Sequence, residues 1–254
     1  MSADDMQYFA HPPADKRIYY GSNELQFGDL RLPSGNGLYP VILVIHGRCW
    51  RAKYALSYAD ALMQAFPKEG FATWSIEYLR VGNDGGGWPG TFADIANGAD
   101  HLNVIAAEHR LDLNKTVAMG HSAGGHFALW LAARSQLPPD ASGFAKTPLN
   151  IAAVLALAPA PDLAHLHEKQ LCGHVIYQLM GGSPDQFPER FKLSDPMQLA
   201  PDAPLLLVIG AHDAAWAPVD LRYADHAEAR GDDVTVVDAP LSGHFEMVDP
   251  RSST

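Results

Sequence analysis

The chain has 254 residues, of which 47% are hydrophobic and 19% are charged, a composition typical of a globular protein. Twenty-nine acidic and 18 basic residues give a formal net charge of −11. Because such a chain repels phosphate groups, nucleic acid and an anionic membrane surface are disfavoured as partners. The first residues lack the pattern of a secretory leader, and no apolar run reaches the roughly 20 residues of a membrane span.

These features predict a cytoplasmic protein. Two cysteines are present, Cys49 and Cys172, which are too few for a disulfide scaffold in a chain of this length. In a reducing compartment we expect both thiols to be free, with a bridge between them as the less favoured alternative.

Apolar runs of strand length alternate with longer helical patterns, which predicts an α/β fold with about eight strands, mostly parallel, and helices on both faces of the sheet. The expected strands cover residues 17–20, 24–32, 41–45, 71–76, 116–119, 151–157, 205–209 and 234–237. The expected helices cover residues 56–66, 92–109, 123–134 and 219–230.

We expect a single domain over residues 1–254. The segment 159–204 has little strand character and is long for a simple connection, which predicts a small cap-like insertion. In a parallel α/β sheet the ligand site lies beyond the carboxyl ends of the strands. Polar residues that directly follow strands are therefore the candidates for a site.

The best candidate for a nucleophile is Ser122, in the sequence Gly-His-Ser-Ala-Gly of residues 120–124. This G-x-S-x-G pattern lies between a predicted strand and a predicted helix, which is the context that a nucleophile elbow requires. The N–H of Ala123, at the start of the helix, is a natural donor to an oxyanion. The alternative is a glycine-rich turn whose serine only caps the helix.

A serine needs a base to take its proton, and an acid to orient that base. His244 follows the last predicted strand and is the expected base, with His121, His126 and His212 as rivals. Asp213 follows the strand 205–209 and is the expected acid, with Asp162 as its rival. The order Ser, Asp, His along the chain is that of the α/β-hydrolases.

The second oxyanion donor is expected on the loop after the strand 41–45, from Gly47 or Arg48. The sequence here resembles the H-G-G-x-W motif of the kynurenine formamidase-like and small carboxylesterase branch of the α/β-hydrolases. Further matches to this branch lie at residues 120–125, 181–184, 187–190, 210–213 and 242–245. The resemblance implies an α/β-hydrolase fold and a hydrolase of short-chain esters or of an aryl formamide.

One departure from this motif is Arg48, which stands where the branch has its second glycine. If this position requires a positive φ, the arginine strains the loop. Its side chain either enters the site, where it could bind an acidic group, or faces solvent. A second departure is the short C-terminus, which lacks the final helix of the branch. We therefore expect an open sheet face that a second copy covers in a homodimer.

The sequence thus predicts a serine hydrolase that cleaves small carboxylic esters through an acyl-enzyme intermediate. The alternatives are an aryl formamidase, or a catalytically weakened scaffold that acts as a binding protein. No cofactor and no metal are expected, since His165 and His167 have a spacing that places them on different faces of a helix. The candidates for substrate contact are His121 and three tryptophans on loops, Trp50, Trp88 and Trp216.

Overall fold

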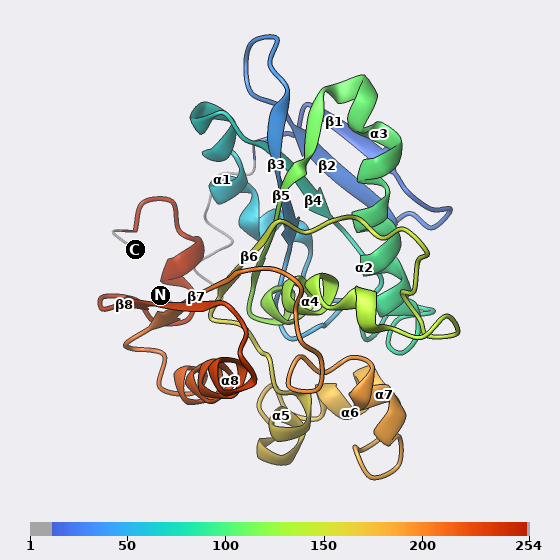
Figure 1. Cartoon of the computed structure of the whole chain (residues 1–254), viewed down its shortest axis with the longest axis vertical. Coiled ribbons are helices and arrows are strands. Elements are labelled where there is room, and N and C mark those ends of the chain that lie inside the picture. The colour runs from blue at the N-terminus through green and yellow to red at the C-terminus, as the bar shows by residue number, and fades with distance from the viewer. Residues whose placement is uncertain (1–11, 253–254) are drawn as a thin grey trace.

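The computed structural model describes residues 12–252 and is built around one eight-stranded sheet in the order β1-β2-β4-β3-β5-β6-β7-β8 (Figure 1). The pairs β1/β2 and β2/β4 are antiparallel, and all other neighbours are parallel. The predicted mostly parallel sheet is confirmed. Its strands are β1 (Lys16–Tyr19), β2 (Phe27–Arg31), β3 (Tyr39–Ile45), β4 (Ala72–Ile76), β5 (Leu111–His121), β6 (Ala153–Leu157), β7 (Leu205–Gly210) and β8 (Val234–Ala239).

Helices and short 3-10 turns connect these strands. The α-helices are α1 (Asp60–Met63), α2 (Gly90–Asp100), α3 (Leu102–His109), α4 (Ala123–Ala132), α5 (Leu163–Lys169), α6 (Val175–Met180), α7 (Pro188–Lys192) and α8 (Ala217–Arg230). The 3-10 turns are η2 (Leu56–Ala59), η3 (Phe66–Glu69), η4 (Arg134–Gln136) and η5 (Glu246–Val248). The helix predicted over residues 92–109 is divided at His101 into α2 and α3.

Successive side chains of β3 point to opposite faces of the sheet, and each face is covered by its own apolar core. Val41, Leu43 and Ile45 belong to a large core with residues of α2, α3, α4 and α8. Ile42 and Val44 belong to a smaller core with residues of η2, α1 and η5. In Figure 1, α2 and α3 accordingly lie on the side of the sheet away from α1.

The smaller core is incompletely covered over β6, β7 and β8. In the described residues, η5 is the only helical element after His244. A hollow of about 340 Å³ remains on this face, lined in part by Leu155, Val208 and Val237. The predicted homodimer would cover this face and stays a prediction.

The segment expected to be cap-like contains α5, α6 and α7, which lie together at one end of the molecule beside α8 (Figure 1). Two side chains of α4 attach it to the body of the protein. Trp130 Nε1 donates to the carbonyl of Leu193 (2.9 Å), and His126 Nε2 bonds the carbonyl of Ser194 (2.8 Å). All ten residues of α4 are buried, as expected of a helix that is enclosed by sheet and cap.

A disulfide joins Cys49, after β3, to Cys172, between α5 and α6. The expectation of two free thiols was wrong, because the fold brings these loops to a Cα–Cα distance of 5.9 Å, well within bonding range. The bridge closes a loop of 123 residues, which in a chain-entropy model stabilises the protein by about 4–5 kcal/mol. The expected cytoplasmic location stays a prediction. Within residues 12–252, no helix has the length and apolarity to cross a membrane.

Candidate active site

Ser122 lies at the tight turn between β5 and α4, with φ 54° and ψ −121°. Residues other than glycine rarely adopt this conformation, and it occurs mainly at functional sites. Close approaches of the backbone explain the neighbouring glycines. A Cβ on Gly120 would lie 2.1 Å from the oxygen of Gly124, and a Cβ on Gly124 would lie 2.0 Å from the oxygen of Ile45. The predicted strand–turn–helix is therefore present, and the start of α4 packs closely against the end of β3.

The backbone N–H of Ala123 is available at this turn because Ala123 is the first residue of α4. The N–H groups of a first helical turn have no partner within the helix, and the helix dipole favours negative charge there. Since α4 is buried, water screens this dipole little. Ala123 thus remains the candidate for the first oxyanion donor.

His244 and Asp213 form a hydrogen-bonded pair at the carboxyl edge of the sheet. Asp213 follows β7, and its Oδ2 lies 2.6 Å from Nδ1 of His244. The Asp213 side chain is 5% exposed, so its attraction to the imidazole is weakly screened. The indole of Trp216 stacks on the His244 ring, with centroids 5.2 Å apart and planes at 24°. Trp216 therefore lies at the site, where it restricts the orientation of the imidazole.

His121 connects the nucleophile elbow to the loop of His244. Its Nε2 lies 2.7 Å from the backbone carbonyl of His244, and its Nδ1 lies 3.1 Å from the hydroxyl of Tyr58. Because a carbonyl accepts, Nε2 carries the proton and Nδ1 accepts from Tyr58. Burial, reinforced by the nearby His244, lowers the pKa of His121 well below its usual value, so the ring is neutral. His121 is 3% exposed and positions the loop, which corrects its expected role in substrate contact.

The serine and the histidine are held by adjacent loops but are not hydrogen-bonded to each other in the described residues. Catalytic hydrogen bonds are often long in ligand-free sites and shorten in the complex with substrate. The contact between His121 and the His244 carbonyl fixes how far apart the two loops can move.

The loop after β3 differs from expectation at Gly47. Its N–H donates to the hydroxyl of Tyr58 at 2.8 Å, so it is already used within the protein. Gly47 also lies too close to the elbow for a side chain, since a Cβ would be 2.2 Å from the His121 oxygen. Of the two predicted donors on this loop, Arg48 is the remaining candidate. No pattern in the sequence indicated the role of Tyr58, whose hydroxyl connects Gly47 to His121.

Arg48 occupies the left-handed region with φ 77°, and Cys49 and Trp50 follow it at 54° and 53°. The strain that the sequence predicted for an arginine at this position is therefore present, at about 1 kcal/mol or more for each such residue. The side chain of Arg48 packs over the ring of Tyr54 (4.4 Å) and beside that of Phe245 (5.3 Å). It is half-buried among aromatic rings next to the histidine loop.

A buried ionic network supports this loop from below. His46 Nε2 lies 2.8 Å from Oε1 of Glu77, and Arg80 bonds the same oxygen. Burial raises the pKa of Glu77, but His46 and Arg80 lower it further, so the carboxylate stays charged. Because Ile45 pairs with Ile76, His46 and Glu77 follow neighbouring strand ends. This adjacency was the signal that could have revealed the network in the sequence.

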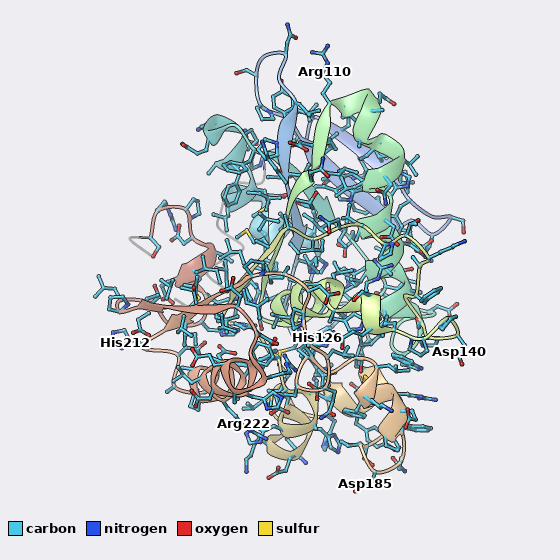
Figure 2. All side chains as sticks on the ribbon, in the orientation of Figure 1. Arg110, His126, Asp140, Asp185, His212 and Arg222 are labelled. Carbon is cyan, nitrogen blue, oxygen red and sulfur yellow. A yellow bond between two sulfur atoms is a disulfide. The ribbon has the colours of Figure 1, made fainter. Side chains whose placement is uncertain are left out.

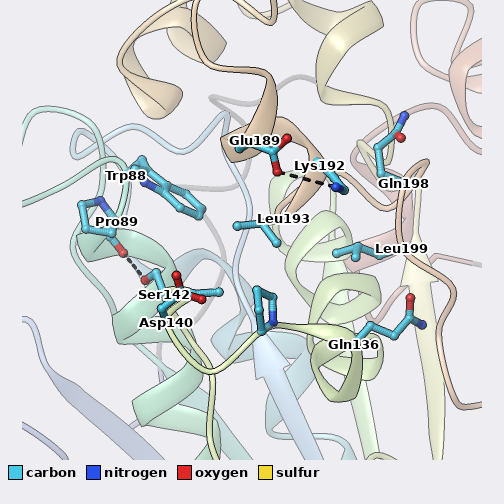
Figure 3. Close-up of a pocket in the computed structure, with 12 residues that line it drawn as sticks. Trp88, Pro89, Gln136, Asp140, Ser142, Glu189, Lys192, Leu193, Gln198 and Leu199 are labelled. Atoms are coloured by element: carbon cyan, nitrogen blue, oxygen red, sulfur yellow. Dashed lines mark hydrogen bonds and ion pairs between the residues drawn. The ribbon is translucent and has the colours of Figure 1, made fainter.

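Two of the tryptophans expected to contact substrate lie away from the candidate residues Ser122, Asp213 and His244. Trp50 is 0% exposed, and its indole donates to Nδ1 of His126 in the core (3.4 Å). Trp88 lines a surface hollow of about 750 Å³ together with Leu193 and Leu199 (Figure 3). Ser122, Asp213 and His244 do not line this hollow. Their position after strands was a poor guide because the side chains turn away from the sheet edge.

The rival residues have other roles. Asp162 caps α5 by accepting the N–H of His165 (2.9 Å), and it pairs with Arg222 (3.1 Å). His126 lies inside the molecule, where burial lowers its pKa to about 4, and His212 is exposed at the surface (Figure 2). In the part of the chain that the structure describes, no three His, Cys, Asp or Glu side chains form a group that could hold a metal ion.

Asp220 of α8 should make stability depend on pH. It is 0% exposed, both carboxyl oxygens lack partners in the described residues, and burial together with Asp213 raises its pKa well above the usual value. Above about pH 4 the folded protein therefore holds one proton more than the unfolded chain, and stability falls as pH rises. Asp220→Asn cannot ionise. We compare the free energy of unfolding of Asp220→Asn with that of the parent, measured in urea at pH 5 and at pH 8. The difference should be larger in favour of the variant at pH 8, by more than about 1 kcal/mol. An equal difference at both pH values would contradict this.

Comparison with known proteins agrees with this geometry. A family model described as BD-FAE matches residues 29–220, a range that includes Ser122 and Asp213. The chain belongs to the BD-FAE family. This is an α/β-hydrolase-type esterase family, so the predicted superfamily is confirmed. No curated protein sequence gives a significant match to this BD-FAE protein.

Solved structures share the fold of the BD-FAE protein at low sequence identity. Esterase B from Lactobacillus rhamnosis (HN001) aligns with a TM-score of 0.81 and 19% identity, over 98% of this chain and 85% of the other. A truncated carbohydrate esterase from gut microbiota aligns with a TM-score of 0.75 and 22% identity, over 93% and 96%. A bifunctional GH43-CE from Bacteroides eggerthii aligns with a TM-score of 0.72 and 21% identity, over 89% of this chain. The BD-FAE chain spans 35% of that bifunctional protein.

Proposed function

We propose that this BD-FAE protein is a serine carboxylesterase that cleaves small carboxylic esters through an acyl-enzyme intermediate. One observation carries the proposal. At the carboxyl edge of the sheet, Ser122 is held in a strained turn at the start of a buried helix, and the adjacent loop holds His244 at 2.6 Å from Asp213.

In the proposed reaction, Ser122 Oγ attacks the ester carbonyl carbon while Nε2 of His244 takes the hydroxyl proton. The negative charge that develops on the carbonyl oxygen is bound by the N–H of Ala123 and by that of Arg48. The imidazolium then protonates the leaving alcohol, and an acyl group remains on the serine. Water, deprotonated by His244, attacks this acyl group and releases the carboxylic acid and the free enzyme.

Asp213 has two functions in this scheme. Its bond to Nδ1 leaves Nε2 without a proton and able to act as the base, and its charge stabilises the imidazolium that forms during the reaction. The stack with Trp216 and the bond from His121 to the His244 carbonyl hold the ring and its loop in place.

Similar proteins support an ester substrate with a short acyl chain. Esterase B has also been solved with a tributyrin phosphonate inhibitor, and two other similar structures are a carbohydrate esterase and a GH43-CE protein. A phosphonate resembles the tetrahedral intermediate of ester hydrolysis, which this proposed site is arranged to stabilise. We infer that short acyl esters are substrates, whereas the alcohol component remains to be found by assay.

A fluorophosphonate probe tests the proposal without knowledge of the substrate. We expect one adduct per folded chain, located on Ser122 by peptide mass spectrometry, and none on heat-denatured protein. The unlabelled protein should hydrolyse p-nitrophenyl acetate and butyrate faster than longer esters or an aryl formamide, and the labelled protein should hydrolyse none of them. A folded protein that forms no adduct would contradict the proposal and favour a binding scaffold, and faster formamide cleavage would favour an aryl formamidase.

A further inference from the structure

The oxyanion loop, residues 47–51, carries Arg48 and is anchored at both ends by hydrogen bonds. At its start, the Gly47 N–H donates to Tyr58 at 2.8 Å. At its end, the N–H of Val81 donates to the carbonyl of Trp50 at 2.9 Å, and the indole of Trp50 is fully buried. Arg48 and Cys49 lie between these anchors, in a left-handed conformation that residues with side chains adopt only when their surroundings hold it.

The centre of the loop is fastened to the cap-like segment by two links. Cys49 is joined covalently to Cys172, in the turn between α5 and α6. Two residues farther along the loop, Arg51 Nη2 donates to the carbonyl of the same Cys172 at 2.7 Å. Both links reach a single residue of the cap, so movement of this turn would be transmitted directly to the loop.

The position of the bridge suggests a role beyond global stability. Cys49 directly follows Arg48, whose N–H is the candidate second oxyanion donor, and the bridge therefore restrains the backbone one residue from that donor. We propose that the Cys49–Cys172 disulfide is a positioning element of the active site, which holds the oxyanion loop and makes hydrolysis depend on the oxidised state of the bridge. This inference rests on the proposed function.

Reduction of the bridge is a balanced exchange with a dithiol reagent. One thiolate of the reagent attacks a sulfur of the bridge, the S–S bond breaks, and a mixed disulfide forms. The second thiol of the reagent then closes its own ring disulfide, which leaves Cys49 and Cys172 as thiols. Two electrons and two protons pass from reagent to protein. Both cysteines are partly exposed, so a small dithiol can reach them in the folded protein.

The test is to treat the native enzyme with dithiothreitol and to follow ester hydrolysis and far-UV circular dichroism together. Loss of an oxyanion donor lowers kcat by about a hundred- to a thousandfold, and a donor that is only loosened should cost at least about tenfold. We expect kcat to fall by at least that factor with KM little changed, before any change in the spectrum. Reoxidation should restore activity. The double variant C49A/C172A should have the low kcat from the start and should not respond to dithiothreitol.

A destabilised control separates positioning from stability. Arg134→Ala removes a buried arginine that binds Asp100 at 2.7 and 3.0 Å and the carbonyl of Gly143, none of which belongs to the oxyanion loop. This variant should lower the melting temperature without lowering kcat. If the reduced enzyme keeps its kcat, or if activity and spectrum are lost together, the bridge stabilises the fold as a whole and the inference is overturned. If the oxidised parent itself does not hydrolyse esters, the proposed function fails instead.

Discussion

Replacement of Ser122 by alanine should reduce kcat for p-nitrophenyl acetate by a factor of about 10⁴ or more. The proposed reaction begins with attack by its hydroxyl, and no other group on the described elbow can form the acyl-enzyme. Residual turnover should reflect only the oxyanion donors and substrate binding, which stay in place. Steady-state kinetics together with a thermal melt measure both activity and folding.

Ser135→Ala is the matched control, because this serine is exposed and bonds Asp202 rather than the site. It should keep the kcat of the parent. If Ser122→Ala turns over esters at the parent rate while folded, Ser122 is not the nucleophile and the proposed mechanism is wrong.

Asp213→Asn should be the second large loss, of about 10⁴ in kcat. An amide at this position can donate its N–H to Nδ1, which would favour the tautomer that places the proton on Nε2, where it blocks the base. It would also remove the charge that stabilises the imidazolium. The hydrogen bond of 2.6 Å between His244 and Asp213 is the structural basis of this prediction. The change in kcat can be measured at a fixed pH near neutrality.

Asp162→Asn provides the comparison, since Asp162 follows the neighbouring strand β6 and was the rival acid. Its carboxylate caps α5, and asparagine is an equally good cap, so kcat should stay within about threefold of the parent. If Asp162→Asn loses most of its kcat while Asp213→Asn stays active, Asp162 rather than Asp213 is the acid that orients His244.

Tertiary contacts join the parts of this candidate site in one chain of hydrogen bonds. The Gly47 N–H donates to Tyr58, the Tyr58 hydroxyl donates to His121, and the His121 ring donates to the carbonyl of His244. The oxyanion loop, the nucleophile elbow and the histidine loop are therefore adjusted to one another. The first two bonds are buried and the third is partly buried, so loss of Tyr58 would leave unpaired polar groups in the interior.

The eight strands could be predicted because their signal is local. Runs such as Val41–Ile45 and Leu205–Ile209 are continuous apolar runs of strand length, rich in β-branched and leucine residues. The sequence also placed Ser122, Asp213 and His244 correctly after strands, since the carboxyl ends of parallel strands meet at one edge. The positive φ of Arg48 agrees with the second glycine of the H-G-G-x-W motif that the sequence resembles.

Other features depend on which loops the fold brings together, which no local pattern encodes. The sequence alone determined the α/β architecture and the candidate residues for the site. Only the tertiary structure decided that Cys49 meets Cys172, that the Gly47 N–H is used by Tyr58, that Trp50 is buried, and that Trp216 stacks on His244. The physical reason is that strand and helix periodicity act over neighbouring residues, whereas these contacts join residues 11 to 123 positions apart and exist only once the sheet is assembled.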